Sequence, residues 1–148
     1  FLSEFNNIDA VSARIFRVYG KGSRDIISRW VGDALQGKEI KVFSQDNSFD
    51  YIYAEDVADG LLYMCAHKLE GEVYNLGTNN STSIGEVVRI LREKIPNIKI
   101  THTDDIILRE NSAANMENMF KATEWRPHYN IQSGIEEIII YNKNKKMD

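Results

Sequence analysis

The sequence predicts an α/β fold with some parallel strands, built as one domain over residues 1–148. First, short strand-like segments alternate with amphipathic helical segments along most of the chain, a pattern typical of this fold class. Second, 148 residues with 43% hydrophobic content can bury a substantial core. Third, the chain contains no internal repeat, low-complexity tract or obvious linker.

The first segment covers residues 11–18, where imperfect alternation and β-branched side chains indicate a strand. Two glycines in residues 19–23 mark a loop, and Ser23 can cap the helix that follows. Apolar residues recur at helical spacing in that helix, which is expected to end at Gly37. Residues 39–43 then form a short strand.

A second strand and helix follow a polar turn. Residues 49–53 predict a strand, and a helix begins near Asp56, where early carboxylates suit the positive end of the helix dipole. This helix runs through Cys65, the only cysteine, which we expect to be a buried small hydrophobe. Residues 72–76 form another strand.

The remaining elements are marked by their ends. Ser83 and Glu86 match a capping box at the start of an amphipathic helix, and Pro96 stops that helix. Residues 98–102 form a strand, a short helix follows a less regular region, and residues 131–141 form the last helix.

The composition limits the possible partners. A net charge of -4 and a pI near 5.4 give no general attraction to nucleic acid or anionic lipid. No apolar run is long enough to cross a bilayer, and the basic run at residues 143–146 is expected to be solvated. We therefore expect a soluble, cytoplasmic protein without nucleic-acid or membrane partners.

Several motifs of catalysis are missing. No G-x-G-x-x-G turn occurs, and the Gly20–Gly22 fragment is interpreted as a flexible loop. Tyr141 and Lys145 have the Tyr-x-x-x-Lys spacing of a proton-exchanging pair, but they lie in the basic tail and we interpret the match as chance. The three histidines and one cysteine fit no metal spacing. We therefore assign no catalytic residue and no metal ligand.

Four sequence blocks nevertheless follow one another in the order of a known family pattern. They are RIFRVYG at 14–20, FDYIYAED at 49–56, GEVYNLGT at 71–78 with TSI at 82–84, and a closing set of Arg109, NMFK at 118–121, WRP at 125–127 and SGI at 133–135. Together they resemble the second half of the extended short-chain dehydrogenase/reductases, the NAD-dependent nucleotide-sugar epimerases and dehydratases. The resemblance implies late strands and helices of a Rossmann-like sheet plus the small substrate-binding lobe. Residues 1–148 would then be a C-terminal portion, with the N-terminal dinucleotide-binding half absent.

The resemblance also implies roles for particular positions. Arg109 matches an arginine that pairs with the substrate diphosphate, whereas Phe49 stands where a first such arginine is usual. Family members usually have Asn at the position of Arg17, and an arginine there adds a charge and can only donate hydrogen bonds. The implied cofactor-binding residues are Phe16, Arg17 and Val18, and the implied substrate-binding residues are Arg17, Phe43, Phe49, Tyr51 and Arg109.

Structural roles stay open beside these functional ones. Arg109 could be an ordinary solvated arginine, and Phe43, Phe49 and Tyr51 could be packing residues of one strand face. Asp50, Glu55 and Asp56 are interpreted as turn and cap residues rather than catalytic acids.

The expected function is that of a substrate-binding portion of such an enzyme, inactive alone. The full-length parent would use NAD or NADP, and this chain alone would bind neither. Its partners would be a nucleotide sugar and either the missing half or a second copy. Two alternatives stay open: a non-catalytic ligand-binding or interaction module that keeps the fold, and an enzyme whose substrate lacks a diphosphate.

Overall fold

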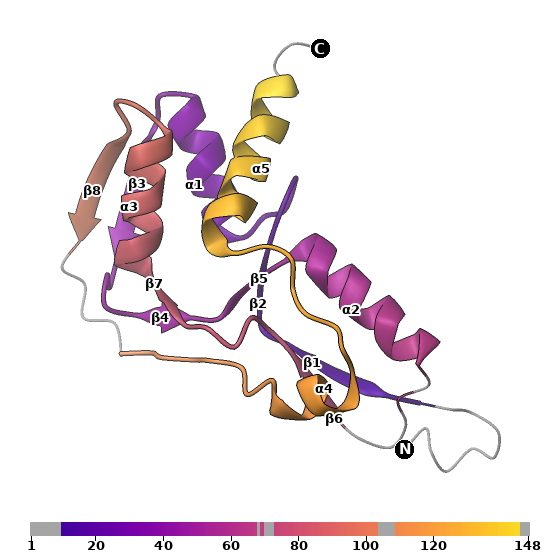
Figure 1. Cartoon of the computed structure of the whole chain (residues 1–148). Coiled ribbons are helices and arrows are strands. Elements are labelled where there is room, and N and C mark those ends of the chain that lie inside the picture. The colour runs from indigo at the N-terminus through magenta and orange to yellow at the C-terminus, as the bar shows by residue number, and fades with distance from the viewer. Residues whose placement is uncertain (1–9, 68, 70–72, 104–108, 146–148) are drawn as a thin grey trace.

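The computed structural model describes residues 10–67, 69, 73–103 and 109–145. Three of the four strand pairs in this part of the chain are parallel, which confirms the α/β prediction (Figure 1). The elements are β1 (Ser12–Ile15), β2 (Arg17–Tyr19), α1 (Ile26–Leu35), β3 (Glu39–Phe43), β4 (Ser48–Phe49), β5 (Tyr51–Tyr53), α2 (Ala54–Ala66), β6 (Val73–Leu76), β7 (Thr82–Ser83), α3 (Ile84–Lys94), β8 (Lys99–Thr103), α4 (Glu117–Ala122) and α5 (Ile131–Asn144).

The single strand predicted at residues 11–18 is in fact two strands, β1 and β2, which have different partners. β1 pairs with β6, and this pairing ends where Phe16 N–H donates to Leu76 O at 2.9 Å. The next residue, Arg17, donates its N–H to Asp50 O at 3.0 Å, and β2 continues along β5. The chain breaks at Phe16 because it changes from one neighbouring strand to another.

The strand predicted at residues 49–53 is likewise divided, at Asp50, into β4 and β5. The Asp50 side chain is fully buried and accepts hydrogen bonds from Thr78 N–H and Thr78 Oγ1, both at 2.7 Å, and from Ala114 N–H at 3.0 Å. A carboxylate that satisfies three donors from two other segments fixes the backbone there, so the pairing of β4 with β7 gives way to that of β5 with β2.

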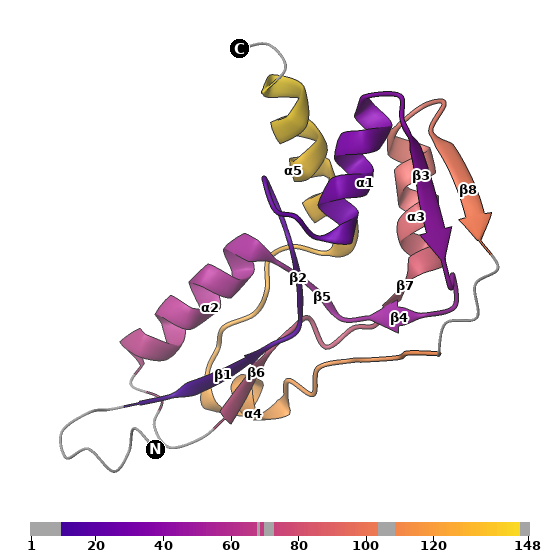
Figure 2. The same ribbon diagram turned by 180° about the vertical axis from the view of Figure 1, so that it is seen from behind.

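The core consists of two clusters, and both views separate the elements that hold them (Figures 1 and 2). One cluster lies among α1, α3, α5 and the β3–β8 pair, and the other lies among α2, α4 and the β1–β6 pair. The short β2–β5 pair joins them. Buried members of the first include Ile27, Val31, Ile40, Leu91, Ile135 and Ile138, and those of the second include Ile52, Met64, Leu76, Met116, Met119 and Trp125.

Helix α1 is capped two residues later than predicted. Asp25 Oδ1 accepts from the N–H groups of Ile27 at 2.8 Å and Ser28 at 3.0 Å, whereas Ser23 Oγ accepts from Asp25 N–H. A carboxylate at the cap also suits the helix dipole better than a hydroxyl does. The predicted end is confirmed, because Gly37 has φ +74 just after the last turn.

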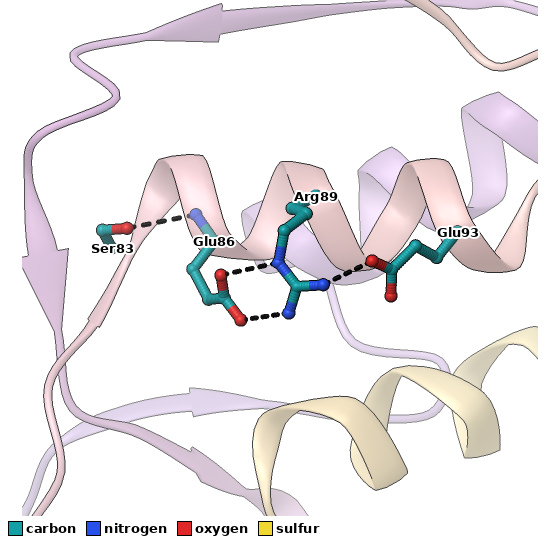
Figure 3. Close-up of polar contacts among 4 residues, drawn as sticks. All are labelled: Ser83, Glu86, Arg89 and Glu93. Carbon is teal, nitrogen blue, oxygen red and sulfur yellow. Dashed lines mark hydrogen bonds and ion pairs between the residues drawn. The ribbon is translucent and has the colours of Figure 1, made fainter.

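Helix α3 begins at its predicted cap, but the capping box is not completed (Figure 3). Ser83 Oγ accepts from Glu86 N–H at 3.1 Å. The Glu86 carboxylate instead binds the Arg89 guanidinium through two hydrogen bonds, and Glu93 binds Arg89 from the next turn. Pro96 follows the end of the helix as predicted.

Helix α2 differs from the prediction in two ways. It begins at Ala54 rather than near Asp56, although Asp56 does lie in its first turn. Cys65 is exposed rather than buried, because it lies on the outer face of the helix. None of the helices that the structure describes has the length and apolar content needed to cross a membrane.

Candidate functional site

A cleft of about 530 Å³ opens where β1 gives way to β2, beside β4. The three contributing segments are far apart in the sequence. The first two meet because β2 pairs with β5, and β4 leads directly into β5. The cleft is lined by Phe16, Arg17, Phe49, Arg109, Glu110, Asn111 and Ser112. Four predicted site residues, Phe16, Arg17, Phe49 and Arg109, are thus brought together.

Arg17 and Phe49 touch within this cleft. The Arg17 Cζ atom lies 3.6 Å from the centroid of the Phe49 ring, a cation–π contact. The ring is only 5% exposed, and the Tyr51 ring meets it edge-on at 5.9 Å. Tyr51 is also directly opposite Arg17 in the strand register. Burial raises the pKa of Tyr51, and the neighbouring Arg17 guanidinium offsets part of that rise.

The segment after Arg109 is held along β4 by backbone hydrogen bonds. Ser48 N–H donates to Glu110 O, and Ser112 N–H donates to Ser48 O, both at 3.0 Å. The Asn111 Oδ1 atom also accepts from Ser48 Oγ at 2.9 Å. Sequence reasoning missed the last three lining residues, although their position directly after Arg109 was a signal that could have found them.

The charge of the lining is positive on balance. Two guanidinium groups, on Arg17 and Arg109, and one carboxylate, on Glu110, give a net charge of +1. In the described part of the chain neither arginine forms an ion pair with a carboxylate. Exposed arginines without acidic partners suit an anionic ligand, since the guanidinium fork matches carboxylate and phosphate oxygens.

A model of the NAD dependent epimerase/dehydratase family matches residues 2–77, which include β1, β2, β4 and β5. The chain belongs to this family. Two of the cleft's three segments therefore fall within the matched region, and the segment that begins at Arg109 lies beyond it.

Known members of the family resemble the chain over almost its whole length. A putative UDP-glucose 4-epimerase of Methanocaldococcus jannaschii is 26% identical over 97% of this chain and 50% of the relative. The structure of ADP-L-glycero-D-manno-heptose-6-epimerase from Helicobacter pylori matches with a TM-score of 0.81 and 25% identity over 96% of this chain and 47% of that one. The structure of a dTDP-glucose 4,6-dehydratase of Bacillus anthracis in complex with NAD matches with a TM-score of 0.81 and 25% identity over 93% of this chain and 45% of that one. The chain thus spans about half the length of these proteins.

The other predicted site residues of this family member lie outside the cleft lining. Val18 is half-buried and packs against the second core cluster. Phe43 ends β3 opposite Thr103, on a different strand pair from Phe49, so the idea of one shared strand face is wrong for it. Tyr51 lines a neighbouring pocket of about 260 Å³ with Thr78, Asn80 and residues 127–131. The binding roles of all these residues remain predictions.

The three acidic residues near β5 have structural partners. Asp50 holds the loops described above, and buried Asp56 accepts from the N–H groups of His128 at 2.8 Å and Tyr129 at 3.0 Å. Glu55 accepts from Lys21 Nζ and Tyr129 Oη, both at 3.1 Å, and the Lys21 bond lowers its pKa. None of them is among the cleft residues that the structure describes.

The remaining candidates for chemistry lie elsewhere. Tyr141 is in α5, and its carbonyl accepts from Lys145 N–H at 3.1 Å, so the two residues share the last turn of a helix. In the described ranges no three His, Cys, Asp or Glu side chains gather as a possible metal site.

Proposed function

We propose that the chain is the substrate-binding C-terminal portion of an NAD-dependent nucleotide-sugar epimerase or dehydratase of the cytoplasm, inactive by itself. The observation that carries this function is the cleft that gathers Phe16, Arg17, Phe49 and Arg109. Three separate segments converge there, and two of them belong to the region that matches the family. Such convergence of a few polar groups in one concave site is typical of ligand binding.

The ligand chemistry follows from charge and shape. The positive lining suits a phosphate ester, the half-buried ring of Phe16 offers apolar contact, and Asn111 and Ser112 add side-chain hydrogen-bonding groups. A nucleotide sugar combines these features: an anionic diphosphate between a base and a polar sugar. The names of the Methanocaldococcus relative and of the Bacillus dehydratase include UDP-glucose and dTDP-glucose respectively.

The chain can supply one wall of a dinucleotide site. Ile15 ends β1 with 41% of its surface exposed, and Phe16 beside it lines the cleft. Ligands of α/β sheets bind at the carboxyl ends of parallel strands, so these apolar side chains fit a nicotinamide ring. When bound, NAD or NADP would supply hydride transfer. The residues of this chain would pack against the ring and exclude water, while the dinucleotide-binding half would hold the rest.

We expect that half to cover exposed apolar side chains of the β1–β6 pair. Ile15 and Val73 are 41% and 51% exposed, and because Ile15 pairs with Leu76 and Val73 with Ser12, they lie on opposite faces of this pair. Burying such side chains is favourable by about 25 cal/mol per Å² of apolar surface. If a second copy covers Val73 instead, light scattering will show concentration-dependent dimers of the chain, and Val73→Lys will reduce them.

Isothermal calorimetry tests the binding function. The chain is titrated with UDP-glucose, dTDP-glucose and NAD, and the titrations are repeated with Arg109→Ala. We expect sugar-nucleotide binding that weakens about tenfold or more without Arg109, since hydrogen bonds to charged groups contribute about 1.5–3 kcal/mol. Arg126→Ala is the matched control, because Arg126 also stacks on a phenylalanine but is outside the cleft lining. Micromolar NAD binding without any nucleotide-sugar binding would refute the assignment.

A second candidate function is a non-catalytic ligand-binding module. It is favoured by Asp50 and Asp56, whose carboxylates are buried and occupied by backbone donors, so neither is free for proton transfer. The gene sequence separates the two functions. A reading frame that continues upstream into a Gly-rich turn and a Tyr-x-x-x-Lys pair supports the enzyme, and a start codon directly before residue 1 supports the module.

A further inference from the structure

Two side chains of the cleft lining lie in direct contact. The Arg17 guanidinium lies on the Phe49 ring, and both residues line the cleft together with Arg109. We propose that Arg17 is the residue that binds a phosphate group of the ligand in this cleft and that Phe49 is its positioning residue. This inference rests on the proposed function, and it names a specificity-determining pair within that site.

The contact holds Arg17 in a defined place. Its backbone is fixed by the Arg17 N–H to Asp50 O bond and by the register with Tyr51. Its guanidinium carbon lies 3.6 Å from the centroid of a ring that cannot move easily, because Phe49 is 5% exposed and packs against Tyr51. A long side chain that is already ordered loses less rotamer entropy on binding a ligand.

The same contact leaves Arg17 able to bind. A guanidinium whose carbon lies over a ring can still donate several N–H groups to phosphate oxygens, although Arg17 also has a side-chain hydrogen bond with Tyr51. The side chain remains exposed at the surface of the cleft, and no carboxylate among the described residues forms an ion pair with it. Arg17 can therefore donate to a ligand without first breaking a salt bridge.

Arg109 supplies a second guanidinium from another segment of the same lining. Two arginines suit a diphosphate, which carries at least two negative charges, better than a single charge would. Two further groups of the lining change its affinity for an anion. The Glu110 carboxylate opposes binding of an anion, whereas the Asn111 amide engages Ser48 through Oδ1, which leaves its Nδ2 protons to donate. The cleft is thus expected to select phosphate esters over neutral sugars.

The pair Arg126 and Phe120 is a built-in comparison. The Arg126 guanidinium lies 4.0 Å from the Phe120 ring centroid, but Arg126 also donates to the carbonyls of Thr123 and Trp125. Its Nη1 group is therefore bonded inside the protein, and Arg126 does not line the cleft. Arg126 therefore forms an arginine–phenylalanine contact without a binding role, and its replacement is not expected to change ligand affinity.

The test is calorimetric titration of the chain with inorganic pyrophosphate, UDP, UDP-glucose and uridine. We expect Arg17→Gln to weaken pyrophosphate and UDP binding about tenfold or more and to leave uridine binding unchanged. Phe49→Leu keeps an apolar side chain but removes the π face, and is expected to weaken both anions about threefold to tenfold. Phe49→Tyr, which keeps the π face, is expected to bind both anions nearly as tightly as the wild type. Arg126→Gln, the control, leaves all four titrations unchanged.

The salt dependence supplies an independent readout. Wild-type pyrophosphate binding weakens as salt is added, and the slope is shallower in Arg17→Gln because one fewer charge is neutralised. If UDP-glucose binds but Arg17→Gln and Phe49→Leu change nothing, the inference is overturned and the proposed function stands. If pyrophosphate binds through Arg17 but no nucleotide sugar does, the proposed function fails and the inference stands. Absence of binding by every anion overturns both.

Discussion

Replacing Gly134 by alanine should destabilise the protein, although alanine is the better helix former. Gly134 is buried within α5, and a Cβ atom there would lie 2.1 Å from the Tyr19 hydroxyl oxygen and 2.7 Å from Tyr19 Cζ. The Tyr19 ring is 1% exposed, and its edge packs against Tyr53 at a centroid distance of 5.3 Å. The ring therefore has no empty space into which it can move.

The size of the effect follows from three contributions. Glycine to alanine in a helix interior is favourable by about 1 kcal/mol. Overpacking of a filled core costs about 1–3 kcal/mol. Displacing the tyrosine also breaks the bond from Tyr19 Oη to Asn130 O, 3.1 Å long, at a cost of about 1 kcal/mol. We expect a net loss of about 1–3 kcal/mol, or roughly 3–10 °C in Tm for a domain of this size.

Urea denaturation followed by circular dichroism measures this loss. Gly32→Ala in α1 is the matched control, because a Cβ atom there meets only Asn142 Oδ1, at 3.9 Å, and the change should stabilise by about 0.5–1 kcal/mol. In a Tyr19→Phe background the closest atom is gone, so the cost of Gly134→Ala should fall by about 0.5–2 kcal/mol. A Gly134→Ala protein at least as stable as the wild type would refute the packing argument.

Three further predictions concern polar groups. Asp50→Ala should lose about 3–5 kcal/mol of unfolding free energy because it leaves three donors, two part-buried and one buried, without their charged acceptor. Asp46→Ala, at an exposed position, should change the unfolding free energy by less than about 0.5 kcal/mol. Ser83→Ala should lose about 1 kcal/mol of unfolding free energy, because it removes the cap of α3. Glu86→Gln should lose clearly less, since the Glu86 carboxylate binds Arg89 and does not complete the capping box. Equal losses in urea denaturation would contradict this. Burial raises the pKa of Tyr53 from 10.0 to about 12. The unfolded state therefore releases this proton first, and the stability should fall as the pH rises from 10.0 to about 12. Ionisation of Tyr53 in the folded protein near pH 10.0, measured as phenolate absorbance, would contradict this.

The sequence was most informative where local signals decide the structure. Residues 39–43 form a strand as predicted, and the helix predicted at 131–141 is present and extends to Asn144. Alternation and helical periodicity are local properties, so they can be interpreted without knowing the neighbours. The breaks at Phe16 and Asp50 could not be predicted in this way. They depend on which strand lies beside the chain, and on buried donors from residues remote in sequence.

The candidate site shows the same division. The patterns at residues 14–20 and 49–56 and the closing block with Arg109 predicted the site residues, and Phe16, Arg17, Phe49 and Arg109 do line one cleft. Nothing local could show that two of them stack, because that contact depends on how β2 and β4 approach each other. Cys65 was wrongly expected to be buried: its neighbour Met64 is buried, but Leu61 and Leu62 are exposed, so an apolar neighbourhood in the sequence does not show which face of α2 meets the core.

The change of partner at Phe16 has a consequence for how the protein unfolds. Residues 12–19 contact one core cluster through β1 and reach the other through Tyr19, and residues 48–53 cross between the clusters in the same way. Neither cluster can unfold without disrupting two segments that also contribute to the other cluster. The two clusters should therefore unfold as one cooperative unit. Circular dichroism and tryptophan fluorescence are expected to give the same transition, even though Trp30 and Trp125 lie in different clusters.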